Sequence, residues 1–270
     1  MSPVTWGASP WGQPVILHAA WQLLWVSLAA GAAFAVGHAL WARSRKPVQA
    51  PAAPAPAGLP ERILRHGRPA RVFHWVMAAS MLTLLATAFA PKLGLAFDWV
   101  GLHVLAGVVL LAAVVFHIVH AVCCLDFAAI WPQPADLGEV RALLHPAGRD
   151  GVAARPGKYP LGNKLYHLAI VVVGLTMAAT GLVMLWRVRT PLLARDPYRF
   201  FDDAGWGVVY AVHGLAGLSL IALVVIHVYF ALRPEKRAIT RSMVVGTMDR
   251  DFFLSHHDPA RWSGEKDAAR

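Results

Sequence analysis

The chain has 270 residues, of which 57% are hydrophobic and only 15% are charged, and its net charge is +10. This composition is too apolar for the surface of a water-soluble domain, so soluble enzymes are excluded. The apolar residues form stretches of about 20 residues, as a membrane-spanning helix requires, without the alternation of a barrel strand. The basic residues lie between these stretches and form no compact patch with aromatic residues, which excludes a nucleic-acid partner. The sequence therefore predicts an all-α integral membrane protein.

Five stretches are predicted to span the membrane, at residues 15–41, 72–90, 100–122, 163–186 and 207–231. No Lys or Arg precedes Arg43, so the first stretch is interpreted as a retained anchor rather than a cleaved signal peptide. Residues 47–60 are rich in Pro and Ala, which favours an extended linker. We therefore expect an N-terminal transmembrane anchor at 1–46, this linker at 47–60, a four-helix domain at 61–262 and a C-terminal tail at 263–270.

Lys and Arg are concentrated in three of the segments that flank the spans. There are seven in residues 43–71, five in 141–164 and eight in 233–270, against one and four in the other two connections. Segments rich in Lys and Arg face the cytoplasm. We expect a multi-pass protein of the bacterial cytoplasmic (inner) membrane, embedded in lipid, with its N-terminus outside and its C-terminus in the cytoplasm.

The two cysteines, Cys123 and Cys124, are adjacent and therefore poorly placed for a disulfide or a shared metal site. The chain has no C-x-x-C-H motif for covalent haem and no group of cysteines for an iron-sulfur cluster. Any redox cofactor must be held by histidine.

Histidine lies repeatedly within or at the ends of three of the predicted spans, those at 72–90, 100–122 and 207–231. Such titratable groups are costly in a membrane and are usually functional, although a single one is as often a hydrogen-bonded core residue. The six residues are His74, His103, His117, His120, His213 and His227.

Two spans share the pattern H-x-L-A-G-x9-H, which runs from His103 to His117 and from His213 to His227. Fourteen helical residues return to within roughly 40° of the same face and separate the two imidazoles by about 21 Å. Each span thus carries one histidine near each membrane surface, and the two spans run in the same direction.

Facing imidazoles at one depth are what a six-coordinate haem b requires, and Gly107 and Gly217 leave room beside the outer pair, His103 and His213. A zinc site or a di-iron site fits less well, because cysteine or carboxylate ligands and Glu-x-x-His motifs do not accompany these histidines. The sequence predicts two haem b groups. The inner haem has three candidate ligands for two positions, and spacing alone favours His117 opposite His227 over His74.

Five motifs together resemble the cytochrome b (gamma) subunits of respiratory formate dehydrogenases, which share a four-helix fold with the b-type cytochrome subunits of nickel-iron hydrogenases. The resemblance covers about residues 62–262. The motifs are R-V-F-H-W at 71–75, G-K-Y-P-L-G-N-K at 157–164, T-G-L-V-M at 180–184, the paired histidines of the last span, and H-H-D-P-A-R-W at 256–262.

The resemblance implies a four-helix dihaem cytochrome b bundle, to which this chain adds one N-terminal span. It implies that His74 and His227 bind the inner haem, with His117 as the alternate ligand, and that His103 and His213 bind the outer haem. His117 and His120 would then lie near haem propionates or a quinone pocket. Arg68 and Arg71 are candidates for pairing with propionates, or else are basic anchors at the membrane surface.

The family passes electrons to a quinone near the inner haem, at the loop that leads into the third helix of its bundle. Here the best polar candidates for contact with menaquinone or ubiquinone are Lys158 and Asn163. The alternative is a basic turn in which Asn163 caps the helix. Pro160 and Leu161 replace the more polar residues expected after Tyr159.

The resemblance implies an electron-transfer subunit that anchors an oxidoreductase complex and exchanges electrons with quinone. We identify no catalytic residue for formate, hydrogen or molybdenum chemistry, so the expected partners are an iron-sulfur subunit and a catalytic dehydrogenase or reductase subunit on the external face. Three alternatives remain open: a cytochrome b subunit of a hydrogenase or another molybdoenzyme, a stand-alone transmembrane quinol-linked reductase, and a haem-free channel or transporter. The last would carry discontinuous helices or ion-pairing residues at the midplane, whereas these spans are continuous.

Overall fold

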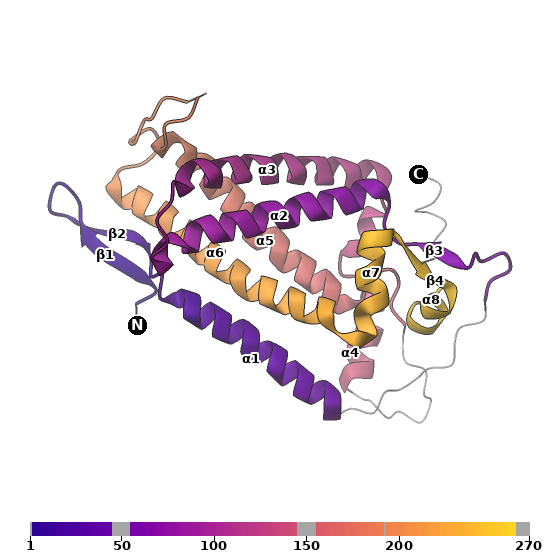
Figure 1. Ribbon diagram of the computed structural model, residues 1–270. Coiled ribbons are helices and arrows are strands. Elements are labelled where there is room, and N and C mark those ends of the chain that lie inside the picture. Colours follow the sequence, from indigo (N-terminus) through magenta and orange to yellow (C-terminus); the bar gives the residue numbers. More distant parts are fainter. Residues whose placement is uncertain (1, 45–54, 145–154, 192, 263–270) are drawn as a thin grey trace. The chain divides into compact units, whose positions relative to one another are not determined.

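The computed structural model describes residues 2–44, 55–144, 155–191 and 193–262 (Figure 1). Within them, five helices are long and apolar enough to cross a membrane, which confirms the predicted all-α membrane fold. The last four begin and end within a few residues of the predicted spans. The five are α1 (Leu23–Ser44), α2 (Arg68–Phe89), α3 (Trp99–Cys124), α5 (Leu161–Met184) and α6 (Asp203–Leu232).

The composition of these helices explains both their formation and their environment. They consist mainly of apolar residues, and none contains Pro beyond its first turn, where Pro69 of α2 is tolerated. Many large apolar side chains point outward, among them Leu105 and Val172, each 60% exposed. Apolar surfaces of this extent are what membrane lipid covers.

Shorter elements connect the long helices. Three further helices are α4 (Leu137–Leu144), α7 (Arg237–Val245) and α8 (Arg250–His256). Five 3-10 turns are η1 (Pro91–Leu93), η2 (Phe127–Ile130), η3 (Pro134–Asp136), η4 (Leu185–Arg187) and η5 (Pro234–Lys236). Residues 47–54 of the predicted linker and the predicted tail 263–270 lie outside the described residues.

The prediction that the first helix begins at residue 15 is wrong. Strand β2 (Pro14–Ala19) pairs in antiparallel fashion with β1 (Val4–Ala8), and α1 begins only at Leu23. The turn is closed by the backbone N–H of Ser9, which donates to the carbonyl oxygen of Gln13 at 2.8 Å. A short apolar run such as residues 15–17 does not distinguish a strand from a helix by its pattern alone, which explains the error.

The contacts divide the chain into two compact units, and each unit contains segments of several long helices. The first comprises Met1–His38, Met77–Ala112 and Ile170–His227, and the second comprises Ala39–Val76, Ala113–Ala169 and Val228–Arg270. Each unit is described by itself.

In the first unit, the N-terminal segment packs closely on α6. Ala19 and Leu24 form one buried cluster with Leu218 and Ile221 of α6. Three glycines make the contact possible: a Cβ at Gly31 would lie 2.9 Å from the Cβ of Val225, a Cβ at Gly214 would lie 2.8 Å from the Cβ of Ala19, and a Cβ at Gly207 would clash with the carbonyl oxygen of Ile16. Small residues at such positions let backbones approach. The N-terminal hairpin and α1 are therefore integral to this unit.

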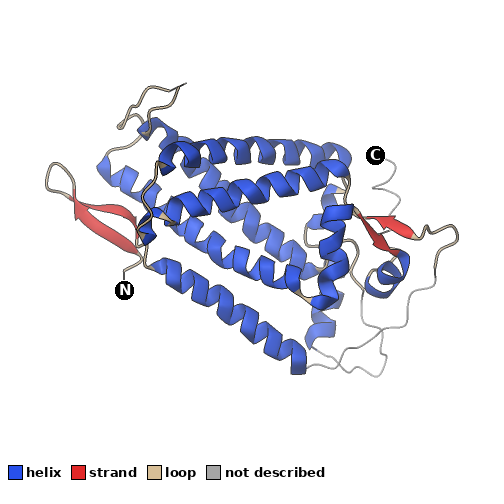
Figure 2. Ribbon diagram, in the orientation of Figure 1, coloured by secondary structure: helices blue, strands red, loops and turns tan. Residues whose placement is uncertain are grey.

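In the second unit, a second antiparallel sheet joins β3 (Arg62–Leu64) to β4 (Thr247–Asp249), as Figure 2 shows in red. The same unit contains a core of apolar side chains from segments far apart in the sequence. Its members are Ile63, Met248, Phe253, Leu254 and Trp262. The sheet and core hold residues near 62 against the segment that follows α6.

Candidate functional site

Two of the predicted ligands meet in the first unit. His103 lies in the first turns of α3 and His213 in α6, and their ring centroids are 6.4 Å apart with an interplanar angle of 66°. Trp99 packs its ring edge-on against that of His103 at a centroid distance of 6.2 Å. The outer pair that the repeated pattern predicts is thus brought together.

Two threonines that the sequence analysis did not single out complete the geometry. Thr87 of α2 places its Oγ1 2.8 Å from Nδ1 of His103, and Thr180 of α5 places its Oγ1 2.8 Å from Nδ1 of His213. Four helices of the unit therefore contribute one polar side chain each. The available signal was a Thr repeated four residues after another Thr in an otherwise apolar span, at 83 and 87 and at 176 and 180.

Two glycines, Gly107 and Gly217, lie on the helices that carry His103 and His213. Gly217 is buried, yet a Cβ placed on it would meet no described atom within 4 Å. A Cβ at Gly107 would meet only the Leu84 side chain, at 3.9 Å. Gly217 therefore lies next to open space, and Gly107 has room for a Cβ in ordinary contact with Leu84.

The geometry can be tested against a metal held between two imidazoles. A metal–nitrogen bond is about 2 Å long and the ring centre lies about 1 Å beyond the nitrogen, so two such rings are separated by roughly 6 Å. The observed 6.4 Å agrees with this separation. Neutral imidazole pairs of this kind are typical axial ligands of low-spin haem, and the residues present fit that group.

The remaining histidines of the predicted inner site lie mainly in the second unit. His117 stacks on Phe73 with a centroid distance of 4.2 Å, and His74 meets the edge of Trp75 at 5.3 Å. His227 ends the last segment of the first unit. The pairing of His227 with His74, or with His117 as the alternate, stays a prediction.

A further histidine, His167 of α5, was missed. Its ring lies edge-on to Trp131 at 5.8 Å, and its Nδ1 is buried with no hydrogen-bond partner among the described residues. Nδ1 of His120 is likewise buried and has no hydrogen-bond partner among the described residues. His167 lies within the predicted span at 163–186, but no second histidine accompanies it there, so the repeated pattern did not reveal it.

The candidate propionate residues lie at the start of α2. Arg68 and Arg71 line a groove together with Val72, Trp75 and residues 243–244. Arg71 donates from Nη1 to the carbonyl oxygen of Val244, and Trp75 donates from Nε1 to the carbonyl oxygen of Met243 at 3.2 Å. These bonds fasten α2 to the end of α7. Their role toward a propionate stays a prediction.

The candidate quinone residues occupy different environments. Lys158 is buried, with its Nζ 5.6 Å from the ring centroid of Tyr159 and 5.9 Å from that of Trp262. Asn163 is exposed in the first turn of α5. The alternative in which Asn163 caps this helix is wrong, because α5 begins at Leu161, whose backbone N–H donates to Oε2 of Glu139 at 2.9 Å.

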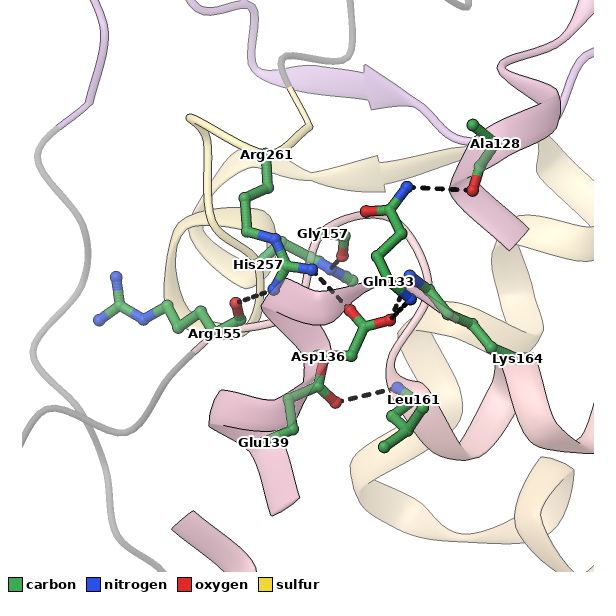
Figure 3. A network of polar contacts seen from close by, with 10 residues as sticks. All are labelled: Ala128, Gln133, Asp136, Glu139, Arg155, Gly157, Leu161, Lys164, His257 and Arg261. Carbon is green, nitrogen blue, oxygen red and sulfur yellow. Dashed lines mark hydrogen bonds and ion pairs between the residues drawn. The ribbon is translucent and has the colours of Figure 1, made fainter. Parts of the chain in front are cut away.

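A buried carboxylate organises this region (Figure 3). Asp136 accepts hydrogen bonds from Nζ of Lys164 at 2.8 Å, from Nη2 of Arg261 at 2.6 Å and from the backbone N–H of Gln133 at 2.8 Å. Burial raises the pKa of the Asp136 carboxyl, but these donors outweigh it and hold the pKa below its ordinary value. Asp136 is therefore ionised at neutral pH.

A buried histidine forms the second half of the same network. His257 donates from Nδ1 to the carbonyl oxygen of Gly157 at 2.7 Å, and Nη1 of Arg65 lies 3.3 Å from its Nε2. Burial, followed by the charge of Arg65, lowers the pKa of His257 to about 3, so the ring is neutral. The segment 256–262 is thereby joined to the loop 157–164.

Paired histidines on apolar helices, with open space at Gly217 and a threonine hydroxyl bonded to each ring, fit a multi-pass membrane cytochrome of the b type. The comparison with known families agrees: the model of the family described as prokaryotic cytochrome b561 matches residues 65–246. The chain belongs to this family. It is therefore a membrane-anchoring cytochrome b that binds haem b and transfers electrons.

A relative supports the same class. The formate dehydrogenase cytochrome b556 subunit of Haemophilus influenzae is 22% identical over 216 residues, which cover 76% of this chain and 84% of the relative.

Proposed function

We propose that this chain is the cytochrome b subunit of a formate dehydrogenase type of complex, and that it carries electrons across the membrane between an external iron-sulfur and catalytic module and the quinone pool. The observation that carries the proposal is the pair His103 and His213, with ring centroids 6.4 Å apart. The name of the Haemophilus influenzae relative supports the choice of complex.

The proposal includes two haem b groups. His103 and His213 would hold the outer one, and His74 with His227 the inner one, with His117 as the alternate inner ligand. Bound haem supplies a one-electron carrier at each membrane surface. The chain's own residues would hold each carrier: on α6, fourteen residues separate His213 from His227, which places these two imidazoles about 21 Å apart along the helix.

The remaining assignments belong to the same proposal. Lys158 and Asn163 are the candidates for contact with menaquinone or ubiquinone on the cytoplasmic side, and Arg68 and Arg71 are those for the propionates of the inner haem. The N-terminus would lie outside and the C-terminus in the cytoplasm, because the basic connections face inward. Residues 1–46 would anchor the chain and residues 61–262 would carry the haem groups, joined by the linker at 47–60.

The first experiment counts the haem. Purified protein should give two haem b per chain in a pyridine haemochrome assay, and acidified acetone should extract both because no covalent bond holds them. His103→Ala should lower the count to one. His38→Ala is the matched control, because this histidine lies in α1 outside the repeated pattern, and it should retain two. A wild-type count near one contradicts the proposal.

The second experiment identifies the complex. Purification from native membranes should yield an iron-sulfur subunit and formate-dependent quinone reduction. Activity with hydrogen instead of formate would assign the chain to a hydrogenase. Quinol oxidation by the chain alone, with no iron-sulfur subunit, would assign it to the stand-alone reductases.

A further inference from the structure

The two outer histidines make the same hydrogen bond to threonines on two different helices. Thr87 approaches His103 and Thr180 approaches His213, each with 2.8 Å between Oγ1 and Nδ1. Thr87 is 2% exposed, and its bond to His103 is shielded from water. The repetition on both rings indicates a requirement of the site rather than a chance contact.

The position of the hydroxyl protons follows from the neighbouring carbonyl groups. Oγ1 of Thr87 lies 2.7 Å from the carbonyl oxygen of Thr83, and Oγ1 of Thr180 lies 2.7 Å from that of Thr176. Two oxygens at this distance repel one another unless a proton lies between them. Each hydroxyl therefore donates to its own helix, and its oxygen is left to accept.

The tautomer of both rings follows from this arrangement. Because each threonine oxygen accepts, Nδ1 of His103 and Nδ1 of His213 must carry the proton and donate. In a neutral imidazole the lone pair then resides on Nε2, which is the atom available to a metal.

We propose that Thr87 and Thr180 are positioning residues that hold His103 and His213 in the tautomer competent to bind iron and that lower the reduction potential of the outer haem. This inference rests on the proposed outer haem site and adds to it the two residues that tune it.

The direction of the effect has a physical cause. Donation of the Nδ1 proton to a hydroxyl oxygen increases the basicity of the imidazole, and a more basic ligand stabilises ferric over ferrous iron. Loss of either bond should therefore raise the potential of the outer haem. Loss of both should raise it further, because each bond acts on a different histidine that would hold the same haem.

The experiment measures this potential in full-length protein with both haem groups bound. Thr87→Val and Thr180→Val keep the side-chain volume and remove the hydroxyl. Each should change the ferric-over-ferrous preference about tenfold, which is about 59 mV upward for a one-electron couple. Thr87→Ser and Thr180→Ser retain the hydroxyl and should restore the wild-type potential. The potential of the inner haem should not move in any of these variants.

Matched controls exist one turn away on the same two helices. Within the part of the chain that the structure describes, Thr83 and Thr176 donate only to backbone carbonyl groups, those of Ala79 at 2.9 Å and Val172 at 2.8 Å. Thr83→Val and Thr176→Val should leave both potentials unchanged. A shift equal to that of Thr87→Val would show that any polar loss in these helices has the same effect, and would overturn the inference.

A second readout needs no haem. In haem-free protein with ¹⁵N-labelled histidine, nuclear magnetic resonance should show His103 and His213 as Nδ1–H tautomers in the wild type and as a mixture in the valine variants. If His103→Ala retains both haem groups, the proposed function fails. If His103→Ala loses one haem but the valine variants keep the wild-type potential and tautomer, only this inference fails.

Discussion

Asp136→Asn removes the carboxylate that forms ion pairs with both Lys164 and Arg261. The side chain of Asp136 is 2% exposed and that of Lys164 is 3% exposed, so the lysine charge would remain buried without its partner. Breaking a buried ion pair in this way costs about 3–5 kcal/mol, much more than an exposed pair contributes. We expect the free energy of unfolding of the second unit to fall by about this amount. The outer haem, proposed to be held by the histidine pair of the first unit, should keep its low-spin spectrum.

Pulse proteolysis of the purified protein across a denaturant series measures the change. Asp249→Asn is the matched control in the same unit, because Asp249 pairs with Arg62 on the surface, with side chains 61% and 55% exposed. This control should change the free energy of unfolding by no more than about 1 kcal/mol. Equal effects of the two variants would refute the argument from burial. In addition, Asp136→Asn with Lys164→Met should cost less than the sum of the single changes.

The pH dependence of the same unit has a defined sign. Since the folded pKa of Asp136 lies below its unfolded value, its contribution is fully present above about pH 4 and is lost as the pH falls through the folded pKa; Asp136→Asn should abolish this part of the acid sensitivity. Gly207→Ala should displace the hairpin from α6 and lower stability by about 1–3 kcal/mol, whereas Gly174→Ala, which meets no described atom within 4 Å, should not. His74→Ala should remove one low-spin haem and abolish quinone reduction, whereas His117→Ala should retain two low-spin haem groups. The reverse result would assign the inner ligand role to His117.

The outer pair, His103 and His213, could be predicted because the spacing of the histidines along the sequence determines it. Fourteen residues between two histidines fix a common helix face and a depth, and the pattern recurs on a second span. Thr87 and Thr180 could not be identified in the same way. Their contacts with the histidines depend on how neighbouring helices are rotated about their axes. That rotation cannot be derived from one sequence.

The other omissions have equally physical reasons. Arg261 meets Asp136 across a sequence separation of 125 residues, and no local pattern reports such a contact. The strand at Pro14–Ala19 was merged with the helix after it because both are apolar and adjacent. The packing of α1 on α6 depends on Gly31, Gly207 and Gly214, whose small size is informative only when the opposite surface is known.

The two cationic partners of Asp136 are synthesised at different times. Its first cation, on Lys164, emerges from the ribosome 28 residues later, whereas the second, on Arg261, emerges 125 residues later and after α6. Domains assemble from the N-terminal side as the chain is made, so we expect Asp136 to pair with Lys164 before it can pair with Arg261, which follows α6 in the sequence. The closing of the second unit is thus expected to be a late step, because it needs Arg261, whereas both histidines of the outer pair precede this residue by almost 50 positions or more.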